Sequence, residues 1–421
     1  MKKLFLLIPM SLAFVFSYSQ TLSLEECHRE AMEQSPLQQQ KNLIASVISL
    51  QNQNLAAAFL PKLSLTGQAT WQSDVITFPE LGPGAAFPEI PHFQFNTALN
   101  VSQIVFDGGA VKMGKELNAV SQQVQTQETE VEINKMKEVV NELYFSILLL
   151  DKNESILTQT LEQLATRRVS LESGVRNGVV LKSNLDAFDK QILLLQQKVD
   201  QLQADRRALL HVMEDWTGRN DLSGASLIVP EYSQPVPEQL SGRPEYQLFD
   251  LQQQQLSQGS ELLKARTLPI VSAFVMGGIG QPNPFNFLET TPSPFMQAGV
   301  KFAWTPWDWN QTQREKEIAS VRKEMVSTRK QQFDLGIRAS IRRDEEMIQS
   351  LEDQIEKDKK IIALQQSIVS QFNAQFENGV ITSAEYLAEV TSLTEAQLNL
   401  EAHTIQAARS RVSILTKTGV L

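Results

Sequence analysis

The distribution of proline constrains this chain more than any other feature of its sequence. None of the seventeen prolines lies between Pro91 and Pro230, and none follows Pro306. Because proline breaks the interior of an α-helix, these stretches are the places where long helices can form. Within them, residues 111–173 and 312–377 are rich in Glu, Gln, Lys and Leu, and each contains one glycine. Two helices of about sixty residues would each be roughly 95 Å long, which an ordinary globular domain cannot house.

The segments that follow these long helices are predicted to be helical return arms. Apolar residues of the first arm recur in alternating steps of three and four, which is the a/d seam of a coiled coil. They are Leu185, Phe188, Ile192, Leu195, Val199, Leu202, Leu209, Met213 and Trp216, and only Arg206 interrupts the series. The second arm keeps the seam less strictly, at Leu393, Ala396, Leu400 and Ile414. Each arm should therefore return along its own long helix, although the heptads alone also fit a coiled-coil spacer.

The break between a long helix and its return arm occurs twice with the same pattern. RNGVVLKSNLDAF at 176–188 matches ENGVITSAEYLAE at 377–389, so that Gly178 and Gly379 lie 201 residues apart. The pattern predicts an internal two-fold repeat in which each half has a long helix, a turn and a return helix. The expected organisation is a signal peptide at 1–19, a first repeat at 20–218, a linker at 219–242 and a second repeat at 243–419.

Four β-strands are predicted between the helical arms. Residues 63–71, 93–105 and 296–304 alternate between apolar and polar side chains, whereas 271–280 alternates poorly. Runs of about 9–11 residues with one apolar face fit strands of an outer-membrane barrel, but they also fit a half-buried sheet of a soluble protein. Trp71, Phe93, Phe95 and Trp304 lie near strand ends, where an aromatic girdle would sit. Pro/Gly-rich segments at 79–91 and 281–294 join the strands of each pair and should be exposed loops.

Four strands raise a counting problem if they span a membrane. Unpaired strand edges in lipid cost several kcal/mol for each polar group, so the sheet must close on itself. The smallest barrels of this type have about eight strands, so one chain cannot close a barrel alone. Closed cyclic symmetry is the usual solution for homo-oligomers, and three chains would supply twelve strands.

The N-terminus and the net charge limit the compartment and the partners. Lys2 and Lys3, the apolar run 4–16 and the small-x-small site 17–19 have the layout of a secretory signal peptide. An uncleaved anchor is the alternative, but the run is shorter than the roughly 20 residues that a spanning helix needs. Without this segment, 36 Lys and Arg face 48 Asp and Glu, which gives a formal charge of −12. Such an acidic surface disfavours nucleic acid as a partner. Cys27 is the single cysteine, which excludes a disulfide framework and is expected to be an ordinary helix residue.

No motif of the sequence indicates catalysis. The four histidines, His28, His92, His211 and His403, have neither HExxH-like spacing nor cysteine companions, so a zinc site is not expected. Gly277-Gly-Ile-Gly280 resembles part of a phosphate loop, but Pro282 and Pro284 follow where a helix should begin. Tight strand packing or a strand-end turn is the expected role of these glycines. No Gly-x-Ser-x-Gly nucleophile elbow is present. We therefore expect no enzyme activity and no cofactor.

Nearly the whole chain, from Leu22 to Gly419, resembles the TolC-type outer-membrane efflux family. The resemblance is carried by motifs that occur in order along the sequence. They are LSLEECHREAMEQSP at 22–36, Leu60-Pro61-Lys62-Leu63, Phe106-Asp-Gly-Gly109, Gly178 with Asp186-Ala187, Arg243-Pro244-Glu245, Leu268-Pro269, Trp304-x-Pro-Trp-Asp308, and Asn378-Gly379 with Leu387-Ala388.

Membership of this family would imply a mainly α-helical homotrimer with a small β part. The four strands of each chain would join a shared twelve-stranded barrel in the outer membrane of a Gram-negative bacterium, in contact with its lipid. The long hairpins would form a periplasmic α-barrel. The implied function is the exit duct of a tripartite efflux or type I secretion system. The duct would passively conduct substrates from an inner-membrane pump through a periplasmic adaptor.

The resemblance also implies where the duct meets its partners. The two helix breaks would be the turns at the inner tip of the tube, where adaptor hairpins dock. The docking residues would be Gly178, Val179, Val180, Leu181, Asn184, Gly379, Val380, Ile381 and Thr382. A glycine in a left-handed conformation also serves as a plain helix cap, and the two roles do not exclude one another.

A closed tip is expected to depend on apolar packing. Family members close it with contacts among an aspartate, a tyrosine and an arginine, whose positions here are Asn184, Phe376 and Ile381. These three residues cannot form an ionic lock, so we predict a constriction formed by Phe376 and Ile381. Glu385 matches an acidic ring position and is predicted to favour cations, with a solvated surface glutamate as the alternative.

Two other readings remain open at the level of sequence. A soluble periplasmic coiled-coil adaptor or spacer would bury its strands in an aqueous core. An exported enzyme with a helical appendage would have a pocket with convergent polar groups.

Overall fold

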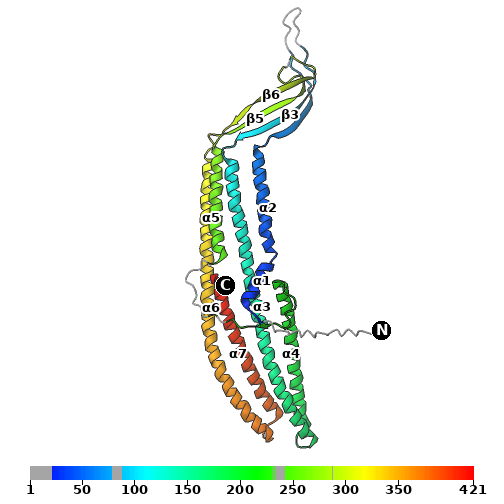
Figure 1. The fold of residues 1–421 in the computed structure, drawn as a ribbon, viewed down its shortest axis with the longest axis vertical. Coiled ribbons are helices and arrows are strands. Elements are labelled where there is room, and N and C mark those ends of the chain that lie inside the picture. The colour runs from blue at the N-terminus through cyan, green and yellow to red at the C-terminus, as the bar shows by residue number, and fades with distance from the viewer. Residues whose placement is uncertain (1–20, 78–87, 231, 233–241, 287) are drawn as a thin grey trace, which may run out of the picture. The chain divides into compact units, whose positions relative to one another are not determined.

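The computed structural model describes residues 21–77, 88–230, 232, 242–286 and 288–421 (Figure 1). The predicted signal peptide, most of the loop at 79–91 and part of the linker at 219–242 lie outside these residues. The chain divides into two compact units. Unit 1 contains the described residues up to 38 together with 131–243 and 335–421, and unit 2 contains 39–130 and 244–334. Among the described residues, no helix combines the length and the apolar character needed to cross a membrane.

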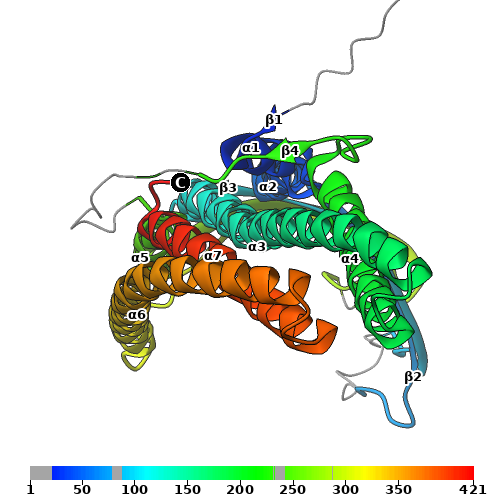
Figure 2. The ribbon, with the colours of Figure 1, turned by 90° about the horizontal axis from the view of Figure 1, so that it is seen from below.

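Four long helices confirm the helical arms predicted from the sequence. α3 (Ala110–Arg176) and α6 (Gln311–Glu377) have 67 residues each, which corresponds to about 100 Å of helix. Their return helices α4 (Lys182–Thr217) and α7 (Ser383–Thr418) have 36 residues each. All four bounds of the first pair recur 201 residues later in the second pair. Figure 2 shows these helices from below, foreshortened.

One apolar core of unit 1 brings the first described residues together with the C-terminal part of α7. α1 (Leu24–Gln34) packs with α3, α4 and α7, and β1 (Thr21–Leu22) pairs in parallel with β4 (Ser226–Leu227). Tyr144 of α3 is buried in this core, and its hydroxyl lies 2.8 Å from the carbonyl oxygens of Leu22 and Ile228. Cys27 lies on α1, as expected, and burial raises the pKa of its thiol to about 12.

A second core of unit 1 lies between the hairpins towards their turns. It contains residues of α3, α4 and α7, and it confirms the predicted heptad seam because Phe188, Leu195 and Val199 are buried in it. Arg206, which interrupts the seam, forms an ion pair with Asp151 and donates a hydrogen bond to the Ala225 carbonyl at 3.2 Å. The seam therefore accommodates a charged residue because α3 supplies its counter-ion.

Unit 2 contains a four-stranded antiparallel sheet and the helices next to it. The strands are β2 (Lys62–Trp71), β3 (Phe93–Phe106), β5 (Ile270–Gln281) and β6 (Ser293–Ala303), in the order β2-β3-β5-β6. α2 (Leu37–Ala56) and the 3-10 helix η1 (Ala57–Phe59) precede β2, and α5 (Pro244–Leu262) and η2 (Leu263–Thr267) precede β5. Figure 1 shows α6 and α2 on opposite sides of this unit, with α5 and α3 between them.

All four strands correspond to segments predicted from the sequence. The weak alternation of β5 has a local reason, since a side chain at Gly278 would meet the Thr97 carbonyl oxygen at 2.1 Å. Tight strand packing is therefore confirmed at Gly278, where β3 and β6 both pair with β5, whereas a β-carbon at Gly277 would have its nearest neighbour at an ordinary 3.8 Å.

Candidate functional site

The two turns predicted as docking sites have the same backbone geometry. Gly178 and Gly379 have φ values of 72° and 71°, which is the left-handed region. The amide of Val179 donates to the Gly174 carbonyl at 3.0 Å, and the amide of Val380 donates to the Gln375 carbonyl at 2.9 Å. Together with the bonds from the two glycine amides, this pattern is a Schellman motif at each helix end. Both glycines therefore cap helices, and a β-carbon at either one would meet no atom within 4 Å.

The apolar residues that follow each glycine divide into an exposed and an inward group. Val179, Leu181 and Val380 are exposed, whereas Val180 and Ile381 are half-buried against the second core. The surface available to a partner at the turns is thus smaller than the predicted set of docking residues. Asn184 is half-buried, and its amide donates to the Leu181 carbonyl at 3.0 Å.

The two turns differ in how the next helix begins. Leu181 precedes α4, and its side chain makes no capping hydrogen bond with the described residues. Thr382 precedes α7 and forms a capping box with Glu385. The Thr382 amide donates to Glu385 Oε2 at 2.8 Å, and the Glu385 amide donates to Thr382 Oγ1 at 3.3 Å. The hydrogen bond from the Thr382 backbone lowers the pKa of the Glu385 carboxyl, so this exposed group is ionised at neutral pH.

The ring of Phe376 lies in a stack of three aromatic rings from three helices. Its centroid is 5.9 Å from Phe188 of α4 and 5.3 Å from Tyr386 of α7, with interplanar angles of 23° and 10°. Phe188 and Tyr386 are buried. The predicted constriction residue therefore already packs within its own chain, where it joins the first hairpin to the second.

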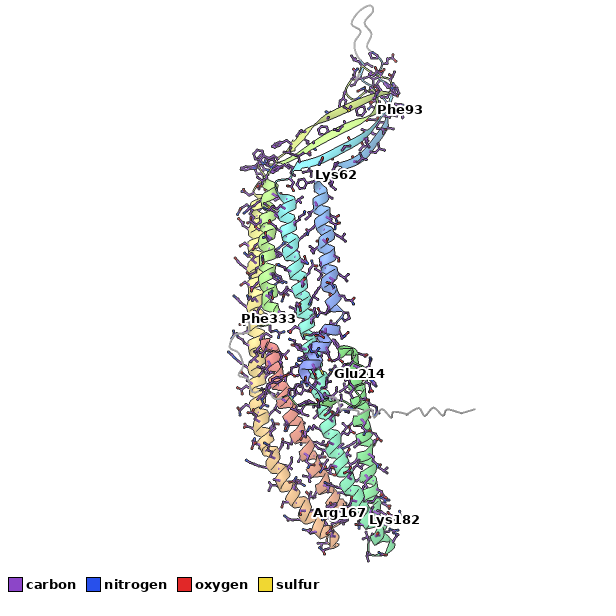
Figure 3. All side chains as sticks on the ribbon, in the orientation of Figure 1. Lys62, Phe93, Arg167, Lys182, Glu214 and Phe333 are labelled. Carbon is purple, nitrogen blue, oxygen red and sulfur yellow. The ribbon has the colours of Figure 1, made fainter. Side chains whose placement is uncertain are left out.

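An ion pair also joins the two hairpins near their turns, and the sequence analysis did not find it. Arg167 of α3 donates to Glu377 of α6 at 2.5 Å. Both side chains are partly exposed, so the pair adds little stability by itself. Figure 3 labels Arg167 and Lys182 at this end of unit 1. A contact between residues about 200 positions apart leaves no periodic pattern in the sequence, so this ion pair could not be predicted. Phe188 was predicted as a member of the heptad seam, but its contact with Phe376 was not.

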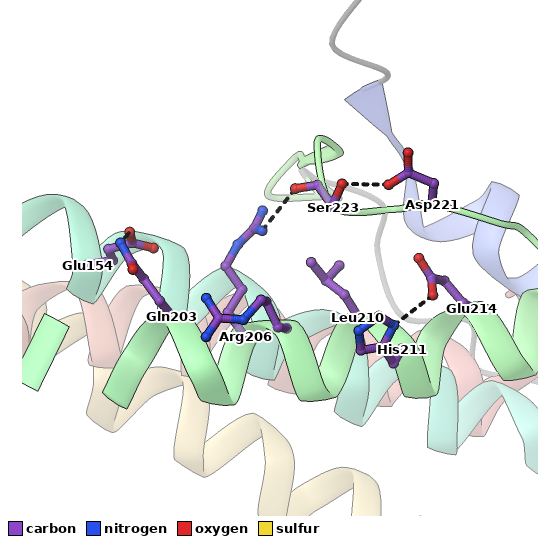
Figure 4. A pocket seen from close by; sticks show the side chains of 9 residues that line it. Glu154, Gln203, Arg206, Leu210, His211, Glu214, Asp221 and Ser223 are labelled. Carbon is purple, nitrogen blue, oxygen red and sulfur yellow. Dashed lines mark hydrogen bonds and ion pairs between the residues drawn. The ribbon is translucent and has the colours of Figure 1, made fainter. Parts of the chain in front are cut away.

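A cavity lined mainly by polar and charged residues lies between α3, α4 and the segment after α4 (Figure 4). It has a volume of about 640 Å³. Arg206 donates to the Ser223 carbonyl at 3.2 Å, and Glu214 Oε1 accepts from the Leu222 amide at 2.6 Å. That hydrogen bond is the main cause of the lowered pKa of Glu214. These polar groups hold the segment after α4 in place.

Each of the four histidines has a different partner. These partners are Asn141 for His28, the Gln72 carbonyl for His92, Glu214 for His211 and Asp358 for His403. Within the described ranges, no group of three or more His, Cys, Asp or Glu residues is arranged to hold a metal ion.

The strand register gives the sheet of unit 2 two chemically different faces. In antiparallel pairs, directly opposed residues share a face. Leu65 opposes Leu99, Leu99 opposes Gly277, and Gly277 opposes Met296. This face carries Leu63, Leu65, Ala69, Trp71, Phe93, Phe95, Leu99, Val101, Val275, Ile279, Met296, Val300 and Phe302. Most of these large side chains are exposed in the described chain.

The opposite face of the sheet is mostly polar. Its polar residues include Ser64, Thr66, Gln68, Thr70, Gln94, Asn96, Asn100, Ser102, Ser272, Gln297 and Lys301, while Phe274, Met276 and Phe295 add apolar side chains in the β5–β6 half. A continuous exposed apolar face of this size is unusual for a monomeric protein in water and marks an interaction surface.

Comparison with known proteins gives a likeness of structure but not of sequence. No family model matches the chain, and no curated protein matches it. Among solved structures, CusC superposes with a TM-score of 0.69 at 16% identity, covering 94% of this chain and 92% of CusC. The outer-membrane protein VceC from Vibrio cholerae gives 0.64 at 13% identity, with 94% and 96% covered. The CmeC outer-membrane channel of Campylobacter jejuni gives 0.65 at 14% identity, with 94% and 85% covered.

Proposed function

We propose, from the premise that this chain has the fold of TolC-type outer-membrane efflux channels, that it is itself such a channel. Three copies would share a twelve-stranded barrel in the outer membrane of a Gram-negative bacterium, and their hairpins would form a periplasmic tube. The assembly would be the exit duct of a tripartite efflux or type I secretion system. An inner-membrane pump would supply the energy, and a periplasmic adaptor would connect it to the duct.

The observation that carries the proposal is the exposed apolar face of the sheet. Exposure of this face to water would be unfavourable, because removing apolar surface from water contributes about 25 cal/mol of free energy per square ångström. Hydrocarbon would solvate it, and the polar face would then line an aqueous lumen. A soluble spacer or adaptor would need another layer over the apolar face, and none of the described elements provides one.

Membrane fractionation tests the proposal most directly. The mature chain should sediment with outer membranes and require detergent for extraction. Recovery of a monomer from the aqueous fraction would favour the soluble spacer instead.

Two further features support closure of the barrel by other copies of the chain. β2 and β6 are the edges of the sheet, and neither pairs with a further strand among the described residues. Two helices on opposite sides of unit 2 carry exposed apolar stripes, which are Leu43, Val47 and Leu50 on α2 and Ile318, Val321 and Met325 on α6.

The residues of the two stripes lie at nearly the same distances from the helix ends next to the sheet. Leu50, Val47 and Leu43 lie six, nine and thirteen residues before the end of α2 at Ala56. Ile318, Val321 and Met325 lie seven, ten and fourteen residues after the start of α6 at Gln311. α2 runs towards the sheet and α6 runs away from it. A head-to-tail contact between α2 of one copy and α6 of the next would therefore bring the stripes together.

Cysteine cross-linking tests this contact. In a Cys27→Ser background, a chain with both Val47→Cys and Val321→Cys is expected to give covalent dimers and trimers with a short bis-maleimide, and nothing larger. Because the ring closes after three copies, no cross-linked species larger than a trimer should form. Denaturing gels of the protein cross-linked in native membranes provide the readout.

The matched control replaces Val321→Cys with Ser320→Cys, which is the exposed neighbour outside the stripe. This control and both single-cysteine variants should stay monomeric on the gel. Efficient cross-linking of Val321→Cys alone would indicate a two-fold contact between α6 helices and contradict the proposed ring.

At the other end of the hairpins, the exposed turns are the proposed adaptor-docking surface. Val179, Leu181 and Val380 supply exposed apolar contact. The half-buried docking residues, Val180, Asn184 and Ile381, would support the shape of the turns. Phe376 and Ile381 are proposed to narrow the tip, since their packing holds the two hairpins of each chain together.

Replacing Glu385 by glutamine should reduce the cation preference of the channel. Three ionised carboxylates near the tip would attract cations, whereas glutamine at this position of a capping box preserves the helix start. The reversal potential in planar bilayers under a salt gradient should move towards zero. Glu346→Gln, which removes the same charge from an exposed position of α6, is the control. An unchanged reversal potential in the Glu385→Gln channel would mean that this carboxylate is a solvated surface group.

A further inference from the structure

The loop between β6 and α6 presents an unusual concentration of tryptophan. Three of the five tryptophans of the chain, Trp304, Trp307 and Trp309, lie within six residues. Their exposed fractions are 53%, 68% and 77%. Indole combines a large apolar ring with one N–H donor, and it is enriched where a protein surface meets the boundary between lipid and water.

Local hydrogen bonds hold this loop in a backbone conformation that non-glycine residues rarely adopt. Trp309 and Asn310 both have positive φ, at 53° and 61°. Asp308 Oδ2 accepts from the Thr312 amide at 2.8 Å, and Arg314 donates to the Trp309 carbonyl at 2.9 Å. The Trp304 indole N–H donates to the Thr267 carbonyl at 3.1 Å. The exposed rings are therefore displayed on a fixed backbone.

The two ends of the sheet differ in charge. At the end that adjoins the helices, residues 57–62, 104–116, 260–270 and 301–316 contain eight Lys and Arg against five Asp and Glu. Two of these acids, Asp107 and Asp308, are engaged as caps of α3 and α6. At the opposite end, the described residues 72–77, 88–92, 282–286 and 288–292 contain three acids and no Lys or Arg. Lys62 and Phe93 mark the helix end and the opposite end in Figure 3.

A polar cavity of about 410 Å³ lies beside the tryptophan loop. The loop contributes Thr305, Asp308 and Asn310 to it, while η2 and α6 contribute Arg266 and Lys316. The side chain of Arg266 is 62% exposed and donates to Glu315 at 2.7 Å, which leaves other guanidinium donors available. The Lys316 ammonium has no hydrogen-bond or ion-pair partner among the residues that the structure describes.

We propose that this cavity and the tryptophan loop bind the phosphate head group of an anionic phospholipid. Arg266 and Lys316 would contact the phosphate, and Trp307 and Trp309 would lie beside the glycerol and upper acyl chains. The inference rests on the proposed membrane position of the sheet, because that position places this end at the periplasmic boundary of the bilayer. The site would help to fix the depth of the sheet in the membrane, because tryptophan and basic residues act as anchors at the interface.

The test uses the full mature protein in detergent and phosphatidylglycerol as the probe, with bound lipid counted by native mass spectrometry. Arg266→Gln combined with Lys316→Gln is expected to weaken lipid binding by at least about tenfold, since each cation near a lipid surface is worth roughly 1 kcal/mol. Lys182→Gln combined with Lys190→Gln removes the same charge from α4 and should leave the affinity unchanged. Trp307→Ala combined with Trp309→Ala should also weaken binding, without any change in charge.

Competition with inorganic phosphate distinguishes a lipid site from a general anion site. Millimolar phosphate should displace little phosphatidylglycerol, because it cannot occupy the tryptophan side of the site. Full displacement, or wild-type affinity in the Arg266/Lys316 variant, would overturn the lipid site. A wild-type chain that still forms channels in that case would leave the proposed function standing. A chain that neither binds the lipid nor fractionates with membranes would overturn both.

Discussion

Replacing Phe188 with alanine is expected to lower the free energy of unfolding by about 3–5 kcal/mol, the range for removal of a buried aromatic ring. Phe188 is fully buried and stacks on both Phe376 and Tyr386, so its loss leaves a cavity between the two hairpins. The two rings that Phe188 contacts belong to α6 and α7, and the loss should therefore loosen one hairpin from the other. Thermal and chemical denaturation of the detergent-solubilised protein, followed by circular dichroism, give the size of the effect.

Val179→Ala is the matched control for this variant. Val179 belongs to the turn next to α4 and is largely exposed, so its truncation should change stability by less than about 0.5 kcal/mol. Equal stabilities of the Phe188→Ala and Val179→Ala proteins would show that the aromatic stack does not hold the hairpins together.

Leu65→Arg should prevent stable membrane assembly, whereas Gln68→Arg should not. The two residues are equidistant from the middle of β2 but lie on opposite faces of the sheet. An arginine that faces lipid near the midplane costs about 2–4 kcal/mol, and three copies would multiply the cost. Leu65 is 72% exposed, so in an aqueous protein its replacement by arginine would be nearly neutral.

The amount of trimer recovered from the outer-membrane fraction measures this difference. The opposite result, with Gln68→Arg impaired and Leu65→Arg normal, would exchange the lipid and lumen faces of the sheet. Equal recovery of both variants would contradict a membrane position for β2.

The sequence predicted single elements well because each has a periodic or compositional signal of its own. Proline-free stretches predicted α3 and α6 to within three residues at each end, and alternation predicted the strands with similar accuracy. β5 was the weakest prediction, since its glycines permit close strand packing and leave few side chains to alternate.

Most contacts between helices and strands could not be predicted from the sequence. Phe376 was predicted to form a constriction with Ile381, and that role stays a prediction. The structure adds that its ring packs against both Phe188 and Tyr386, which lie on the return helices of different hairpins. Likewise, alternation could not reveal that the apolar faces of all four strands coincide. That depends on the register, which only the pairing of β3 with β5 fixes across the two halves of the chain.

The empty space around Gly178 and Gly379 has a consequence for the chemistry of the turns. Nothing within 4 Å would oppose a methyl group at either position, so crowding is not what requires glycine there. The requirement comes from chirality, because an L-residue resists the left-handed conformation. A mirror-image D-alanine would adopt it readily, and by restricting the unfolded chain it would add about 0.4–1 kcal/mol at each turn. A semisynthetic chain could thus stiffen both bends without altering the side chains that surround them.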